Sequence, residues 1–222
     1  MRKFFEIGGV VAAAILIAFG ITSIVVGLNG RDTVHKSLKQ EFIVGSPDMT
    51  PAAIRTEAKK AGLPATLDYP NTAVAGKKID TGDEARAFAG YMRIHALEAS
   101  GGLTYAEMGR WIAKPGTPAK FTDGNGATSV EQYAQVDPKT KQPVDNGARN
   151  LWVTETALTT ALNTSYMAEQ ISLFGIAMGT ALLLSGIGFG ILALGGALRS
   201  PESVFAVLRK RAAKGGGVAA QA

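Results

Sequence analysis

Two long apolar runs constrain the fold of this chain more than any other feature of its sequence. Residues 7–28 and 171–198 contain no charged side chain. A helix of about 20 apolar residues crosses the hydrocarbon of a bilayer and satisfies its backbone hydrogen bonds internally. Both runs are therefore predicted to be transmembrane helices. The first is longer than the apolar part of a secretory signal peptide, so we interpret it as an uncleaved signal anchor, with cleavage near Gly27 as the alternative.

The net charge of +5 resides at the two ends of the chain. Residues 1–6 and 199–222 hold an excess of basic side chains, whereas residues 29–170 contain equal numbers of basic and acidic ones. Basic residues that flank transmembrane helices stay in the cytoplasm. The predicted topology is a multi-pass protein of the cell (plasma) membrane, with both termini cytoplasmic and residues 29–170 extracytoplasmic. Because the basic excess lies beside the membrane, lipids are expected partners and nucleic acid is not.

The predicted organisation follows from these runs. The chain has no cysteine, which excludes disulfides and thiolate metal sites. A segment of about 140 residues can bury one core without them. We predict a mostly α-helical fold: a hairpin of two transmembrane helices with helical stalks and a small, mainly α extracytoplasmic domain. Its parts are a cytoplasmic N-terminus (1–6), transmembrane helix 1 (7–28), the extracytoplasmic domain (29–170) with a helical neck (31–43 and 148–170), transmembrane helix 2 (171–198) and a basic cytoplasmic tail (199–222).

Helix-capping patterns recur in the extracytoplasmic domain. Thr50 precedes Pro51 and predicts a short helix that ends before Gly62. Two capping boxes, at residues 81–84 and 104–107, predict helices that reach about Ser100 and Trp111 respectively. The stretch from 114 to 147 is rich in Pro, Gly, Asp and Thr, so it is predicted to be loop, with one short helix at 129–135.

The helical neck is predicted from apolar spacing. Residues 31–43 continue the first apolar run with Val34, Leu38 and Phe42 at helical intervals. From Ala148 the chain enters the second run without Gly or Pro, so a single helix should extend through both. The apolar stripe of this helix is expected to pack on the 31–43 stripe and consists of Leu151, Leu158 and Leu162. Its threonine-rich face either packs or meets a ligand, or its hydroxyls bond to the preceding helical turn.

Each apolar run also carries a ridge of small residues on one helical face. These candidate helix-packing residues are Gly9, Ala13, Gly20 and Gly27 in the first run and Gly175, Gly179, Gly186 and Gly190 in the second. Small residues let transmembrane backbones approach closely, which matters because no hydrophobic force drives helices together in lipid. One interpretation is that the two helices pair within one chain as a hairpin, and the other is that the second ridge packs against other copies or other membrane proteins. Both can hold, because a helix has more than one face.

Four segments resemble an uncharacterised family of double-pass membrane proteins that recurs in actinobacteria. They are VGSPDMTPAAI (44–54), DTGDEARAFAGYMRIHALEAS (80–100), DPKTKQPV (137–144) and ARNLWVTETALTTALNTSYMAEQISLFGIAMG (148–179). The resemblance covers nearly the whole chain and implies the same two-span topology. It implies no activity, cofactor or catalytic residue.

Few side chains offer catalytic chemistry. The two histidines are His35, in the predicted stalk, and His95, on the helix after Thr81. His95 and Glu98 share a helix face and, with Glu155, form a speculative polar cluster, whose alternatives are a local hydrogen bond and a functional site. Iron and zinc sites without cysteine usually take two or three histidines. We therefore predict no catalytic residue, no metal site and no cofactor.

One segment resembles the beginning of a calcium-binding loop. It reads Asp-Gly-Asn-Gly from Asp123, but Ala127 stands at the next ligand position and Thr128 where the central glycine is needed. A polar turn is the better interpretation of these residues.

The function predicted from these features is that of a non-enzymatic integral membrane protein of the cell envelope. It would be a structural or accessory subunit of a membrane assembly, as a homo-oligomer or with other membrane proteins. The alternative is an extracytoplasmic ligand-binding or sensor module, with a pocket between the neck and the helix after Thr81. An enzyme is the third possibility, and it would need His95, Glu98 or Glu155 inside a cleft.

Overall fold

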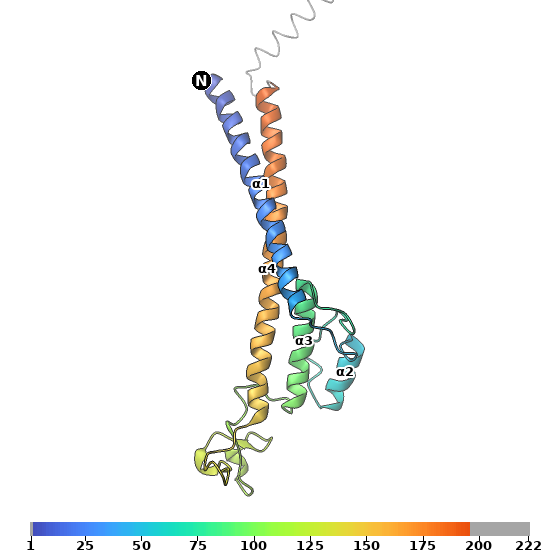
Figure 1. The fold of residues 1–222 in the computed structure, drawn as a ribbon, viewed down its shortest axis with the longest axis vertical. Coiled ribbons are helices and arrows are strands. Elements are labelled where there is room, and N and C mark those ends of the chain that lie inside the picture. The colour runs from blue at the N-terminus through green and yellow to red at the C-terminus, as the bar shows by residue number, and fades with distance from the viewer. Residues whose placement is uncertain (1, 196–222) are drawn as a thin grey trace, which may run out of the picture. The chain divides into compact units, whose positions relative to one another are not determined.

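The computed structural model describes residues 2–195, and side chains from residue 7 onward (Figure 1). This part contains four α-helices: α1 (Arg2–Gln40), α2 (Pro51–Lys60), α3 (Gly82–Ala99) and α4 (Gly147–Leu194). Two short strands, β1 (Trp111–Ile112) and β2 (Ala127–Thr128), and two 3-10 turns, η1 (Ala119–Phe121) and η2 (Glu131–Tyr133), lie between α3 and α4. The predicted mostly helical fold is confirmed in this coarse form. The predicted cytoplasmic tail lies outside the described residues.

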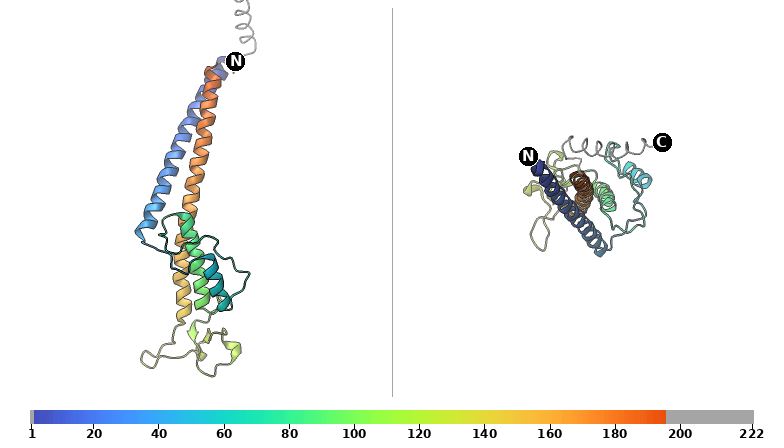
Figure 2. Two further views of the ribbon diagram at one scale, coloured as in Figure 1. Left: turned by 90° about the vertical axis from the view of Figure 1, so that its right-hand side faces the viewer. Right: turned by 90° about the horizontal axis from the view of Figure 1, so that it is seen from above.

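The chain divides into two compact units. Among the described residues, the first unit contains residues 2–30 of α1 and 171–194 of α4, which run side by side (Figures 1 and 2). Only 11% and 17% of the most apolar stretches of these helices are buried, so neither resembles the core helix of a soluble protein. Both helices are long and apolar enough to cross a membrane.

The second unit contains residues 31–170 and has its own core. Helix α3 lies between α2 and the first part of α4 (Figure 2). The core is built from all four helices and the loop before α3, and its most deeply buried large side chains are Ile54, Val74, Ile79, Tyr91 and Ile94. Trp152 of α4 is also buried, and its indole N–H donates to the Ser100 hydroxyl at 3.1 Å. Residues 31–40 and 147–170 are thus held to α2 and α3 by a shared apolar core.

Local capping explains where α2 and α3 begin. The Thr50 hydroxyl accepts from the Ala53 N–H at 3.2 Å, with Pro51 in the first position of α2. Thr81 and Glu84 form the complete capping box at the start of α3. Both helix starts are confirmed, as is the uninterrupted helix from Ala148 into the second apolar run, which belongs to α4.

The predicted helix at 104–111 is wrong. Glu107 Oε2 does accept from the Thr104 N–H at 2.7 Å, as in one half of a capping box, but the chain continues as a turn. Gly109 lies against the backbone of Thr128, where a Cβ atom would clash, and Trp111 enters β1. Strand β1 pairs antiparallel with β2, Trp111 opposite Thr128, and this long-range pairing prevails over the local helix signal. The short helix expected at 129–135 is the 3-10 turn η2.

The predicted neck contact is correct for two apolar residues of the first stripe and wrong for the third. Leu38 is buried and Val34 partly buried in the core that contains Leu158 and Leu162. Helix α1 ends at Gln40, however, and Phe42 has a φ of 51° and a side chain that is 88% exposed. The chain turns there because the backbone after Phe42 bonds to the loop before α3. The Ile43 carbonyl accepts from the Ile79 N–H at 3.0 Å, and the Gly45 N–H donates to the Lys77 carbonyl at 2.9 Å. Leu151, from the opposite stripe, is also exposed.

Candidate functional site

The small-residue ridges of the first unit face each other. A Cβ atom on Gly20 would lie 2.8 Å from the Gly179 carbonyl oxygen, and one on Gly179 would lie 2.7 Å from that of Gly20. Such distances leave no room for a side chain, so the two backbones touch at these glycines. Cβ atoms on Gly27 and Gly186 would likewise lie 2.6 Å from the Ser172 carbonyl oxygen and 3.0 Å from that of Ala13.

The remaining ridge residues lie at looser contacts. A Cβ atom on Gly175 would be 3.7 Å from the Ser23 carbonyl oxygen, and one on Gly190 would be 3.7 Å from Ala13 Cβ. Ala13 is buried, whereas Gly9 is partly exposed. Within one chain, therefore, the ridges are occupied by the contact between α1 and α4, where Ile17, Ile24 and Ile176 also lie against ridge glycines, and many other large apolar side chains are exposed on the outer faces.

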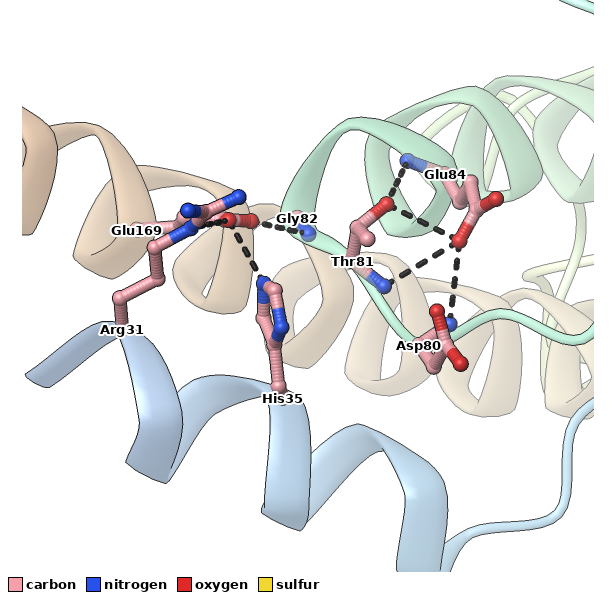
Figure 3. A network of polar contacts seen from close by, with 7 residues as sticks. All are labelled: Arg31, His35, Asp80, Thr81, Gly82, Glu84 and Glu169. Carbon is pink, nitrogen blue, oxygen red and sulfur yellow. Dashed lines mark hydrogen bonds and ion pairs between the residues drawn. The ribbon is translucent and has the colours of Figure 1, made fainter.

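A buried carboxylate joins three helices of the second unit (Figure 3). Glu169 of α4 is 4% exposed. Its Oε1 accepts from Arg31 Nε at 3.0 Å and lies 2.7 Å from His35 Nε2, both on α1, while its Oε2 accepts from the Gly82 backbone N–H at 2.5 Å. The carboxylate is the common acceptor for α1 and for the first residue of α3. We call these four residues the Glu169 network.

The start of α3 is shaped to receive this carboxylate. A Cβ atom on Gly82 would lie 2.7 Å from Glu169 Oε2 and 2.9 Å from the Cα atom of Tyr166, so only glycine permits this approach. The adjacent capping box turns the Glu84 carboxylate away to the N–H groups of Asp80 and Thr81, each 3.2 Å distant. The positive end of the α3 helix dipole, at the Gly82 N–H, therefore interacts with Glu169.

The hydrogen bonds of the network control the ionisation of Glu169. Burial alone would raise the pKa of this carboxyl. The hydrogen bonds from His35, Arg31 and Gly82 outweigh burial and hold the pKa below its usual range. Sequence reasoning missed Glu169, although a signal was present: it lies two residues before one apolar run, and Arg31 lies three residues after the other.

His95 and Glu98 of the speculative polar cluster lie on α3, beside residues that the sequence analysis did not select. His95 forms a group with Asp48, in the turn before α2, and Glu57, on α2, whose ligand atoms all lie within 4.8 Å of one another. His95 Nε2 is 3.1 Å from Asp48 Oδ2, at ion-pair distance but without hydrogen-bond geometry. The hydrogen bond from the Ser46 hydroxyl to the Asp48 carboxylate is the main cause of the lowered pKa of Asp48. Burial raises the pKa of Glu98.

Glu155 does not belong to this group. It lies on α4, is 3% exposed, and accepts a long hydrogen bond of 3.4 Å from the neighbouring Thr156 hydroxyl. Its other carboxylate oxygen, Oε1, has no hydrogen-bond partner among residues 7–195. On the threonine-rich face the structure supports the alternative in which hydroxyls bond to the preceding turn, as in the 2.7 Å bond from the Thr164 hydroxyl to the Thr160 carbonyl.

The segment that resembles a calcium loop is a polar turn. The Asp123 carboxylate accepts from the N–H groups of Gly109, Asn125 and Ala127, at 2.8, 2.9 and 3.0 Å. These bonds hold the turn against β2 and occupy the oxygens that a calcium ion would use.

A polar pocket lies between α3, α4 and the loop that precedes α3. It has a volume of 490 Å³, and its walls include Asp68, Asn71, Asp83, Arg86 and Tyr166. The Arg86 guanidinium stacks over the Tyr166 ring, 4.7 Å from its centre. This is the region where the alternative prediction of a ligand-binding module expected a pocket, between the neck and the helix after Thr81.

No known protein family, curated protein or solved structure matched the chain. The resemblance to the actinobacterial family thus stays a prediction.

Proposed function

We propose that this chain is a non-enzymatic integral membrane protein of the cell envelope, with both termini in the cytoplasm and residues 29–170 outside the membrane. In this proposal it serves as a structural or accessory subunit of a membrane assembly. The observation that carries the proposal is the inside-out packing of α1 and α4 in the first unit. Glycines and alanines lie between the helices, and large apolar side chains such as Phe19 and Phe174 are 64% and 66% exposed. Lipid is the solvent that suits such a surface.

The Glu169 network supports a structural role for the second unit, which in this proposal forms the outer domain. Its carboxylate contacts Arg31, His35 and the Gly82 N–H, so it holds α1, α3 and α4 in one arrangement. A buried carboxylate fixed in this way provides a rigid domain rather than a free acid or base.

The assembly role is tested by purification of the full chain in mild detergent, followed by light scattering and mass spectrometry. The proposal predicts a homo-oligomer or co-purifying membrane proteins. Because the ridges are occupied within one chain, the contacts with partners should map to the outer helix faces or the outer domain in cross-linking. A monodisperse monomer without partners would contradict the accessory role.

A ligand-binding module is the second candidate function, and the polar pocket beside Arg86 and Tyr166 favours it. A ligand of the native state raises the melting temperature by mass action. Screening small polar envelope components against the wild type and Arg86→Ala therefore tests this candidate, with Trp152 fluorescence as the readout. The ligand-binding function requires a compound that raises the melting temperature of the wild type and not that of Arg86→Ala. Compounds that raise both melting temperatures equally would exclude this function.

A further inference from the structure

We propose that Asp48, Glu57 and His95 bind one divalent transition-metal ion in the outer domain. This inference is independent of the accessory role proposed above and concerns a different part of the second unit from the Glu169 network.

Three separate elements bring the ligands together. Asp48 lies in the turn before α2, Glu57 on α2 and His95 on α3, so the group forms only when α2 packs on α3. That packing is fixed by the fully buried Ile54 and Ala58 of α2 and Ile94 of α3. The backbone positions of the ligands are therefore set by the core, and their side chains are partly exposed.

The spacing of the ligand atoms fits a single ion. The donor atoms of the three side chains lie within 4.8 Å of one another. Around Zn²⁺, bonds of about 2.0–2.2 Å place tetrahedral donors about 3.3 Å apart. An inward shift of about 1 Å closes the group on an ion, and carboxylate side-chain torsions supply a shift of this size.

The charge balance also favours a cation. The group contains the carboxylates of Asp48 and Glu57, and Glu98 follows His95 by three residues on α3. In the part of the chain from residue 7 to 195, no lysine or arginine forms an ion pair with any of these three carboxylates. His95 Nε2 lies 3.1 Å from Asp48 Oδ2, and among residues 7–195 this buried nitrogen has no hydrogen-bond partner. A metal ion would supply the missing positive charge and a partner for that nitrogen.

The ligand types select the kind of ion. An imidazole nitrogen suits zinc and its neighbours, carboxylates suit manganese and harder ions, and a mixed set is matched by Zn²⁺ or Mn²⁺. Glu98, three residues after His95 on α3, has a buried oxygen without a hydrogen-bond partner in the described part of the chain. It is in place to accept a hydrogen bond from the other ring nitrogen of a metal-bound His95, or to join the ligands.

The test uses the full untagged chain in detergent, freed of metal with a chelator and titrated with Zn²⁺ and, separately, Mn²⁺ by calorimetry. Co²⁺ serves as the spectroscopic probe for zinc, because its visible absorption reports the number and type of ligands. The chain contains only two histidines and no cysteine, so background binding is low. We expect one equivalent of ion per chain and a melting temperature that rises with metal concentration.

Three variants decide the location. Glu57→Gln and His95→Gln keep the side-chain size and should weaken binding by about tenfold or more, whereas Glu41→Gln removes an exposed carboxylate outside the group and should bind as the wild type does. Far-UV circular dichroism verifies that each variant folds. Absence of saturable binding by the wild type would overturn the proposal. Equal affinity in all three variants would overturn it as well.

Discussion

The backbone N–H of Gly82 donates to the carboxylate of Glu169 at 2.5 Å, across 87 positions of sequence. This bond joins the first residue of α3 to α4, and the same carboxylate receives Arg31 and His35 from α1 (Figure 3). Both tryptophans of the chain, Trp111 and Trp152, lie in the same unit, so their fluorescence reports its unfolding.

Replacing Glu169 should destabilise the second unit strongly. Glu169→Ala leaves the Gly82 N–H, His35 and Arg31 without their shared acceptor. We expect a loss of about 2–3 kcal/mol in the free energy of unfolding, less than for a fully buried pair because Arg31 is half-exposed. Denaturant unfolding followed by tryptophan fluorescence measures the change. Glu41→Ala, at an exposed position, is the control, and equal stability of the two variants would refute the structural role of Glu169.

The lowered pKa of Glu169 predicts a specific dependence of stability on pH. The folded state holds this pKa below the ordinary value of 4.5, so the ionised network stabilises the domain fully above 4.5. That contribution should be lost as the pH falls from 4.5 through the lowered pKa. Melting temperatures of the wild type should therefore fall more steeply in this acid range than those of Glu169→Gln. Parallel curves for the two proteins would mean that Glu169 contributes no such linkage.

The contact between α1 and α4 can be tested with a disulfide, because the chain has no cysteine of its own. A Cβ atom on Gly190 lies 3.7 Å from Ala13 Cβ, inside the range that disulfides require. The double variant Ala13→Cys, Gly190→Cys should form an intramolecular disulfide on mild oxidation, visible as faster migration on non-reducing gels. A Cβ atom on Gly188 would meet no other part of the described chain within 4 Å, so Gly188→Cys with Ala13→Cys is the control. Exclusively intermolecular bonds in the first variant would show that the ridges meet between chains.

Leu38 and Phe42 should differ in their contribution to stability, although both belong to the apolar stripe read from the sequence. Leu38 is 4% exposed in the core, so Leu38→Ala should cost about 2–4 kcal/mol of unfolding free energy. Phe42 is 88% exposed, so Phe42→Ala should change stability by about 0.5 kcal/mol or less. Chemical denaturation of both variants provides the comparison, and a large loss in Phe42→Ala would place this side chain in the core after all.

Much of the helical architecture was predictable because its causes are local. The Thr50 cap with Pro51, and the capping box of Thr81 and Glu84, each lie within a few residues, and the helices begin where these signals indicate. The same local signal at Thr104 failed, because the pairing of β1 with β2 controls that segment. Phe42 lies outside α1 for a similar reason, because the neighbouring Ile43 carbonyl accepts a hydrogen bond from the Ile79 N–H.

The candidate sites were harder to predict because their members are distant in sequence. Glu169 and Arg31 are 138 positions apart, and no periodicity within either helix indicates that they meet. His95 and Glu98 could be placed on one helix face from their spacing. The contact of Asp48 with His95 could not, because it depends on how the turn before α2 packs on α3. Glu155 shows the opposite error: it is chemically suitable, yet the fold buries it on α4 with Thr156 as its hydrogen-bond partner.

The central claim, that two membrane helices hold residues 29–170 outside the cell, is tested most directly by labelling single introduced cysteines. Thr140→Cys probes the outer domain, and Ala219→Cys probes the predicted cytoplasmic tail. A membrane-impermeant maleimide applied to intact cells should label Thr140→Cys, and should label Ala219→Cys only after the membrane is permeabilised. Labelling of Ala219→Cys in intact cells, with Thr140→Cys protected until permeabilisation, would contradict the account.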